Sequence, residues 1–382
     1  MDLASEWLRK IEIDPSNFVE GQLGKLVKTS WNHDFPPALV IIGCPEYRGA
    51  ELGNNTELTL IRKHLYNLFP NLFKGSVWDV GDLIPGERLS DTYIALEEIL
   101  LEIQALGAPI VFLGGSSDLI YPVLGTQEKF EQYYSALAID YKIDYHPSAE
   151  FSNHNYLNRF FQDHPSHLFQ YLHAGIQSYR QNPEVLQFFN KVNYDAVRLG
   201  HFRQNLKAIE PLFRVSNLAF FDMSSVKISD FPCALNPNPN GFYAEDICQM
   251  ARYAGLSKGC DFFGFYDFYF DGDERSNKTS AALIAECIWC YLEALPLRIN
   301  EHPLKNPENY VKFTVSMEEW KQELYFYKSN RTTKWWLQAP RNEQINKAIG
   351  PLDFIPCNEE DYLLAQKNII PETWWVSLFR SN

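Results

Sequence analysis

Three short polar stretches of this chain carry the side chains that could bind a ligand or take part in a reaction. They read Gly114-Gly115-Ser116-Ser117-Asp118, Asp140-Tyr141-Lys142-Ile143-Asp144 and Phe221-Asp222-Met223-Ser224. Each follows an apolar run, so each places polar groups where a buried strand is expected to end. Carboxylate oxygens bind divalent cations, whereas serine hydroxyls bind them poorly and an ammonium group repels them. Together the stretches indicate an incomplete metal site.

These stretches resemble the metal-binding motifs of the ureohydrolase superfamily of arginase, agmatinase and formimidoylglutamase. The family patterns are Gly-Gly-Asp-His-Ser, Asp-Ala-His-x-Asp and Ser-Phe-Asp-x-Asp, whose two His and four Asp hold two manganese ions. By position, Ser117 replaces the first His, Lys142 the second His and Ser224 the last Asp. The resemblance therefore implies no metal pair and leaves room for at most one weakly held divalent ion, such as manganese. Its candidate ligands are the aspartates that match the family, Asp140, Asp144 and Asp222.

The charges at these positions also argue against a metal pair. Four aspartates balance two divalent ions in the family pattern, whereas three aspartates and one lysine leave a net charge of −2 here. At ~4 Å and an effective dielectric constant of about 20, an ammonium–carboxylate pair is worth on the order of 4 kcal/mol before desolvation. We therefore expect Lys142 to replace one metal ion by pairing with Asp140 and Asp222, the alternative being that its head reaches solvent. Further candidate ligands for a single ion are Asp118, His146 and His154.

The resemblance covers roughly residues 37–294. Further matches are Gly43-Cys44-Pro45, Gly53-Asn54-Asn55 and Ile61-Arg62, which are similar to the family's opening strand, glycine loop and first helix. Asp267 stands where the family has the Glu that pairs with the substrate's amidine group, and it is one methylene shorter. Asn153 and His154 lie in a segment similar to the formimidoylglutamase loop after the second metal motif. The resemblance thus implies these three residues as substrate-binding positions.

Apolar runs alternate with amphipathic stretches along the chain, a pattern typical of a parallel sheet covered by helices on both faces. The expected strands are 38–42, 77–80, 110–113, 136–139, 194–199, 218–221 and 262–268, and the expected helices are 57–69, 92–106, 244–254 and 280–292. We predict a doubly wound, mostly parallel α/β sheet, an arginase-like three-layer α/β/α fold. Ligands bind outside the carboxyl ends of such strands, so Asp140, Asp222 and Asp267 should gather at one rim. Alternatively, each Asp caps a following loop or helix.

We expect an N-terminal extension (1–36), an α/β domain (37–294) and a C-terminal extension (295–382). The C-terminal extension lies beyond the resemblance and is rich in aromatic residues, namely Trp320, Tyr325, Phe326, Tyr327, Trp335, Trp336, Tyr362, Trp374 and Trp375. Such side chains either fill pockets of a partner protein or pack onto the parent domain as an added layer.

Composition excludes several classes of function. The 34 Lys and Arg against 48 Asp and Glu give a net charge of −14, which argues against nucleic acid as a partner. No stretch reaches the ~18 apolar residues of a membrane helix, so we expect no membrane insertion and a cytoplasmic protein. The seven cysteines are irregularly spaced, which favours reduced thiols. Cys287-Ile288-Trp289-Cys290 lies in an apolar helical pattern and is interpreted as buried thiols rather than a zinc or redox motif.

Two classes of function remain. The first is a pseudoenzyme with a degenerate metal site and no cofactor, which acts as a scaffold or interaction subunit with protein partners and forms a homo-oligomer. The second is a metal-dependent hydrolase of C–N bonds in linear amidines, resembling formimidoylglutamase or arginase. Loss of three of the six ligands that the family uses favours the first class.

Overall fold

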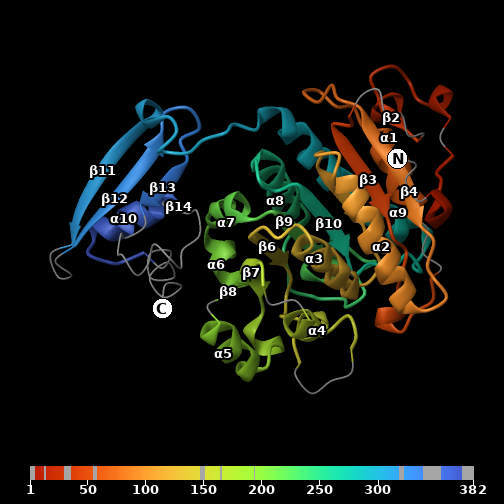
Figure 1. The fold of residues 1–382 in the computed structure, drawn as a ribbon, viewed down its shortest axis with the longest axis horizontal. Coiled ribbons are helices and arrows are strands. Elements are labelled where there is room, and N and C mark those ends of the chain that lie inside the picture. The colour runs from red at the N-terminus through yellow and green to blue at the C-terminus, as the bar shows by residue number, and fades with distance from the viewer. Residues whose placement is uncertain are drawn as a thin grey trace.

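The computed structural model describes residues 5–12, 14–29, 36–54, 58–146, 151–163, 166–192, 194–317, 322–338 and 354–371. It consists of a large sheet with helices on both faces and a smaller C-terminal sheet (Figure 1). The strands of the large sheet are β1 (Leu8–Arg9), β2 (Val27–Lys28), β3 (Leu39–Gly43), β4 (Val77–Leu83), β5 (Ile110–Leu113), β6 (Tyr134–Ile139), β7 (Leu168–Ile176), β8 (Asp195–Arg198), β9 (Leu218–Asp222) and β10 (Phe262–Tyr266). The α-helices are α1 (Thr59–Tyr66), α2 (Leu89–Gln104), α3 (Ile120–Glu128), α4 (Tyr156–Asp163), α5 (Pro183–Lys191), α6 (Leu199–Gln204), α7 (Glu210–Val215), α8 (Ala244–Leu256), α9 (Glu274–Ala294) and α10 (Glu359–Gln366).

The strands of the large sheet are parallel except for one edge strand. Their order is β1-β4-β3-β5-β10-β9-β6-β7-β8, with β2 also paired to β4. β1 runs antiparallel to β4, and the other described pairs are parallel. The predicted mostly parallel, doubly wound α/β fold is therefore confirmed. The strands β5, β10, β9 and β6 are neighbours in the sheet: β5, β6 and β9 lead into the three polar stretches of the sequence, and β10 precedes Asp267.

Alternation of side chains along each strand gives the sheet an apolar core on both faces. In β3, for example, Leu39 and Ile41 belong to one core, while Val40 and Ile42 belong to the other. Helices α1, α8 and α9 contribute to the first core, and α2, α3 and α4 contribute to the second. Burial of these faces fixes the position of the strands and thus of the loops at their carboxyl ends.

Helix α9 is long and apolar enough to cross a membrane by length and composition alone. However, 61% of its most apolar stretch is buried inside the protein, and Ile284 and Ile288 are fully buried in the core. Its hydrophobicity therefore follows from its place beneath the large sheet, where it packs against α1 and α8.

The C-terminal part of the chain forms an antiparallel sheet with its own small core. Its strands, in spatial order, are β11 (Tyr310–Met317), β12 (Gln322–Ser329), β13 (Trp335–Gln338) and β14 (Phe354–Cys357). Phe326 and Leu337 are fully buried in this core, and the rings of Trp335 and Tyr362 stack with their centroids 5.1 Å apart. These aromatic side chains thus pack in a core that belongs to the small sheet itself. Trp320, Trp374 and Trp375 lie outside the described residues.

Arg214 of helix α7 joins this small sheet to the α/β body. Its guanidinium group donates hydrogen bonds to the carbonyl oxygens of Trp335 at 2.9 Å and Cys357 at 2.8 Å. Its central carbon lies 4.8 Å from the ring centroid of Trp336. A second contact is the ion pair between Lys334 and Glu210, with 3.4 Å between nitrogen and oxygen. The two sheets are therefore linked by charged groups on one short helix.

Strand β11 forms the outer edge of the small sheet. Val311 on this strand is 44% exposed. The ammonium nitrogen of Lys312 lies 3.8 Å from the ring centroid of Tyr325 on the neighbouring strand, within the range of a cation–π contact. A positive charge is thus fixed on the edge strand itself.

Candidate functional site

The ends of four neighbouring strands carry the residues that the sequence singles out. Ser117 follows β5, Asp140 follows β6, Asp222 ends β9 and Asp267 follows β10. All four are buried, with at most 4% of each residue exposed. The carboxyl groups of the three aspartates are close enough to shift the pKa values of their neighbours in the cluster. The fold therefore gathers these residues in one cluster at the rim where a doubly wound sheet binds ligands.

Lys142 lies within this cluster and pairs with Asp144. Its Nζ atom is 3.1 Å from Asp144 Oδ1 and 2.7 Å from His154 Nδ1. Burial alone would lower the pKa of Lys142, but the charges of Asp144 and Asp140 raise it above its ordinary value. Burial and the charge of Lys142 lower the pKa of His154, so its neutral ring accepts a hydrogen bond from the ammonium group. The partly buried cation is thus held between a carboxylate and an imidazole.

This pairing differs from the expectation that Lys142 would bridge Asp140 and Asp222. Oδ1 of Asp140 already accepts backbone N–H bonds from Tyr141 and Lys142 at the turn after β6. Oδ1 of Asp222 likewise accepts the N–H of Ser224 at 2.6 Å. The backbone turns at the strand ends therefore use these carboxylates, and Asp144, two residues after the lysine, becomes its partner.

Asp140 and Asp222 form a pair of buried carboxyl groups that contact one another. Burial raises the pKa of both well above the ordinary value, and the negative charges around them add to this effect. The two side chains are close enough for each to shift the pKa of the other. Two carboxylates at such a distance cannot both be charged at low cost, so a proton between them relieves the repulsion. A proton here does part of what a metal ion does in a carboxylate cluster.

Ser117 and Asp267 are hydrogen-bonded to one another across the strand ends. The N–H of Ser117 donates to Asp267 Oδ1 at 2.7 Å, and its Oγ lies 3.1 Å from Asp267 Oδ2 and 3.0 Å from the carbonyl oxygen of Asn153. Burial raises the pKa of Asp267 well above the ordinary value. The Ser117 hydroxyl group therefore has two acceptors within reach, the carboxyl group of Asp267 and the carbonyl oxygen of Asn153. The position that resembles the amidine-binding Glu is thus engaged within the protein.

The backbone at Asp267 makes this closure possible. Its φ angle is 55°, in the left-handed region that asparagine and aspartate tolerate better than most residues. The N–H of Asp267 donates to the carbonyl of Gly115 at 2.9 Å, which holds the turn against the loop after β5. The left-handed turn brings the carboxyl group onto the backbone of Ser117.

Ser224, in place of the family's last Asp, holds a loop. It is fully buried, and its Oγ accepts the N–H of Asn236 at 3.2 Å. The turn-rich segment 236–241 is thereby attached to the end of β9. The hydroxyl group has a structural partner and does not extend the carboxylate cluster.

The other candidate ligands lie in separate networks. Asp118 is fully buried and accepts hydrogen bonds from the hydroxyl groups of Ser116 and Tyr93, and burial raises its pKa to about 6. A Cβ atom on Gly49 would lie 2.1 Å from the carboxyl carbon of Asp118, so the backbone covers this group closely. His146 is exposed, and its backbone is hydrogen-bonded to Asn158. Of these candidates, His154 alone joins the cluster, through Lys142.

His173 of strand β7 is part of the cluster and is not among the residues that the sequence motifs single out. Its Nε2 atom lies 2.7 Å from the carbonyl oxygen of Lys142 and 3.8 Å from Asp140 Oδ2. Burial lowers its pKa to about 4, so the ring is neutral and donates to the carbonyl. It thereby positions the turn that carries Lys142. The available signal is a single histidine within the mainly apolar run of residues 168–176.

The architecture is that of arginase superfamily proteins. The chain is similar to the formiminoglutamase of Trypanosoma cruzi solved with manganese, with 18% identity over 73% of this chain and 99% of that one and a TM-score of 0.64. The formimidoylglutamase of Bacillus subtilis gives 14% identity, the same coverage of this chain, 93% of its own and a TM-score of 0.65. Proclavaminate amidino hydrolase of Streptomyces clavuligerus gives 16% identity over 68% of this chain and 93% of its own, with a TM-score of 0.55. No family model and no curated protein sequence matches the chain.

Proposed function

We propose that this chain is a non-catalytic protein of arginase-like fold that serves as a scaffold or protein-interaction subunit. The observation that carries the proposal is the position of Lys142, whose Nζ atom lies 3.1 Å from Asp144 and 2.7 Å from His154. A cation of the protein itself stands among the carboxyl groups that a divalent ion would need. Binding of such an ion would require the ammonium group to leave its buried ion pair.

The remaining donors at the strand ends fit a pair of divalent ions poorly. A metal ion binds ionised carboxylates, whereas burial favours the protonated forms of Asp140, Asp222 and Asp267. Ser117 and Asp267 are hydrogen-bonded to one another rather than available as ligands. Within the described ranges, no group of three or more His, Cys, Asp or Glu side chains is arranged to hold a metal ion. The proposal therefore includes no dinuclear manganese centre and no step through one.

A scaffold acts through contacts, so the proposal implies protein partners, including further copies of this chain. The net charge of −14 supports protein over nucleic acid as the partner. The fold supports a protein that works in solution, and we propose the cytoplasm as its compartment. The two apolar cores of the large sheet support the proposal of a stably folded scaffold.

The alternative is a hydrolase that acts on a C–N bond of a linear amidine with a single divalent ion. The structural likeness to formiminoglutamases, one of them solved with manganese, favours this alternative. Asp140, Asp144 and Asp222 would be the ligands of that ion. Lys142 would then have to swing away from Asp144 when the ion binds.

Metal analysis combined with turnover assays distinguishes the two proposals. The protein is purified from manganese-supplemented cells, its metal content is measured by mass spectrometry, and formimidoylglutamate, arginine and agmatine are offered as substrates. We expect far less than one manganese ion per chain and no turnover, with Bacillus subtilis formimidoylglutamase prepared in parallel as the active control. Two tightly bound manganese ions with turnover would overturn the scaffold proposal. One ion with metal-dependent turnover would establish the alternative.

A further inference from the structure

Three cysteine thiols meet between helices α8 and α9, away from the carboxylate cluster. Cys248 lies on α8, and Cys287 and Cys290 lie one turn apart on α9. The sulfur atoms of Cys248 and Cys287 are 3.7 Å apart, and Cys290 is close enough to Cys248 for each thiol to shift the pKa of the other. One thiol of α8 thus lies near two thiols of α9.

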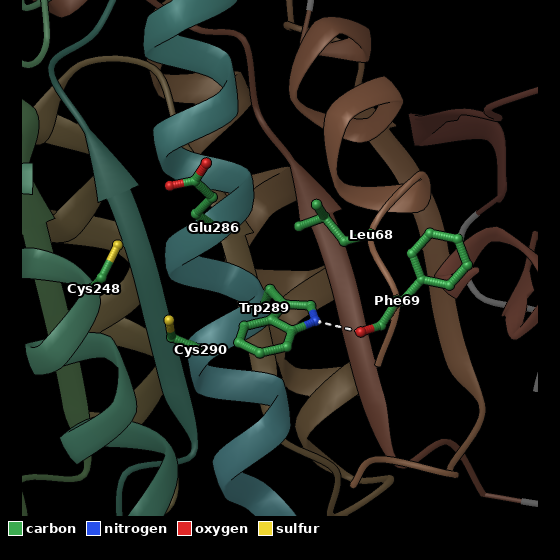
Figure 2. Close-up of a pocket in the computed structure, with 6 residues that line it drawn as sticks. All are labelled: Leu68, Phe69, Cys248, Glu286, Trp289 and Cys290. Carbon is green, nitrogen blue, oxygen red and sulfur yellow. Dashed lines mark hydrogen bonds between the residues drawn. The ribbon is translucent and has the colours of Figure 1, made fainter. Parts of the chain in front are cut away.

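Two of these thiols line a surface cavity. The cavity has a volume of about 350 Å³ and is lined by Leu68, Phe69, Cys248, Glu286, Trp289 and Cys290. Figure 2 shows the two cysteines on one side of the cavity and Leu68 and Phe69 on the other, with Trp289 between them. The indole N–H of Trp289 donates to the carbonyl oxygen of Phe69 at 3.0 Å, which fixes this wall. Small apolar solutes can therefore enter beside Cys248 and Cys290.

The remaining cysteines are shielded from such solutes. Cys248 and Cys290 are partly exposed, whereas the buried cysteines are Cys44, Cys233, Cys260, Cys287 and Cys357. Cys287 points into the core on the same helix and is fully buried. Accessibility thus selects Cys248 and Cys290 among the seven cysteines of the chain.

We propose that Cys248 and Cys290 form a reversible dithiol–disulfide site that reacts with low-molecular-weight disulfides in this cavity. The Cys290 thiol loses its proton to water, and its thiolate attacks one sulfur of the reagent R–S–S–R. This forms a Cys290–S–S–R bond and releases R–S⁻, which takes up a proton. Deprotonated Cys248 then attacks Cys290 Sγ, the bond to R breaks, and the second R–S⁻ leaves and is protonated. Two protein thiols are oxidised, and one reagent disulfide is reduced to two small thiols.

The product bond would link α8 to α9. A disulfide needs sulfurs about 2.05 Å apart. Cys248 and Cys290 line the same side of the cavity, so rotation of their side chains has to bring the two sulfurs together. Hydrogen bonding to neighbouring sulfurs raises the pKa of Cys248 and of Cys290 above the ordinary value. The reactive thiolates are therefore scarce at neutral pH. A reagent with a good leaving group is the appropriate probe.

The test uses 4,4′-dithiodipyridine on the folded, full-length protein. Release of 4-thiopyridone is followed by absorbance, and the disulfide is mapped by mass spectrometry of unreduced peptides. We expect two equivalents of thiopyridone per chain and a Cys248–Cys290 bond. Prior addition of phenylarsine oxide, which binds paired thiols, should block the release.

Single variants distinguish a paired dithiol site from cysteines that react with the reagent independently. Cys248→Ser and Cys290→Ser should each release one equivalent and retain a stable mixed disulfide, whereas the matched control Cys287→Ser should still release two. Circular dichroism verifies that each variant is folded, and the phenylarsine oxide block on the native protein needs no variant. A stable mixed disulfide on the native protein, or a bond mapped between Cys248 and Cys287, would overturn the proposal.

Discussion

The ammonium group of Lys142 and the carboxylate of Asp144 form an ion pair 3.1 Å apart, with only 17% and 2% of their side chains exposed. Two residues separated by one position thus neutralise each other at the end of β6, where the fold would otherwise concentrate negative charge. Because water does not screen this pair effectively, the loss of either partner should be costly.

The first prediction concerns Lys142→Met, which keeps the length of the side chain and removes its charge. An uncompensated buried carboxylate remains, so we expect the free energy of unfolding to fall by roughly 3–5 kcal/mol. Urea denaturation followed by tryptophan fluorescence measures this change. The double variant Lys142→Met with Asp144→Asn should recover a large part of the loss.

Lys129→Met is the matched control, because Lys129 pairs with Glu97 at 2.6 Å with 47% of its side chain exposed. A solvent-screened pair of this kind contributes less than about 1 kcal/mol. Equal losses for the two lysine variants would contradict the role given to the buried pair.

The second prediction is a pH dependence that originates at Asp222. Its pKa in the folded protein is raised above the ordinary value of 3.8, chiefly by burial. The stability linked to this group is therefore fully present below about pH 4 and is lost as the pH rises through the folded pKa. Asp222→Asn should weaken this loss and raise the free energy of unfolding at pH 8. The gain should be about 1.4 kcal/mol for every tenfold difference in proton affinity between the folded and unfolded states.

The pH profile of unfolding from pH 3 to pH 8 provides the measurement for Asp222→Asn. The exposed carboxyl group of Asp271 offers a control, since Asp271→Asn should leave the shape of the profile unchanged. A variant at Asp222 that is less stable than the native protein at pH 8 would argue that the carboxylate is needed in its charged form, as in a metal site.

The third prediction is that three substitutions together create manganese binding. Ser117→His, Lys142→His and Ser224→Asp supply two imidazoles and a carboxylate and remove the competing ammonium group. Manganese at 100 times its dissociation constant should then stabilise the folded variant by about 2.7 kcal/mol, visible as a rise in melting temperature. Ser225→Asp in place of Ser224→Asp is the control. A folded triple variant that manganese does not stabilise would show that the surrounding loops no longer accommodate the ion.

The fourth prediction concerns Arg214, whose contacts join the C-terminal sheet to the α/β body. Arg214→Met removes two hydrogen bonds from a charged donor, each worth roughly 1.5–3 kcal/mol. We expect the C-terminal sheet to unfold at lower urea concentration than the α/β body, and limited proteolysis near residues 295–309 to accelerate several-fold. Lys278→Met is the control, because Lys278 forms an exposed pair with Glu274 on α9. A single unfolding transition for Arg214→Met would contradict this role.

The large sheet could be predicted from the sequence because its strands are buried on both faces and therefore read as apolar runs. The run at residues 110–113 coincides with β5, and the helix expected at 244–254 is contained in α8. Strand β7 is not among the expected strands because Gln170 and His173 interrupt its apolar run. The C-terminal sheet is absent from the expectations as well. Its edge strand β11 is largely exposed, and the aromatic residues of the sheet suit an interface as well as a core.

Most residues of the site could be predicted, with the exception of His173, but their contacts could not. Strand ends place Asp140, Asp222 and Asp267 together by topology, which the alternation of elements already implies. Which carboxylate receives Lys142 depends on the turn after β6, and the closure of Asp267 on Ser117 depends on one left-handed φ angle. Neither is encoded in residue type or spacing, because both arise from the backbone path of the folded loops.

The lysine on strand β11 has a consequence for self-association. Free strand edges invite further strands, and fibril growth begins in this way. A second molecule adding there in register would place its own Lys312 beside the first, so like charges would meet and the cation–π contacts with Tyr325 would be strained. The small sheet should consequently stay soluble at high concentration. Lys312→Val should make its edge strand β11 a site of aggregation.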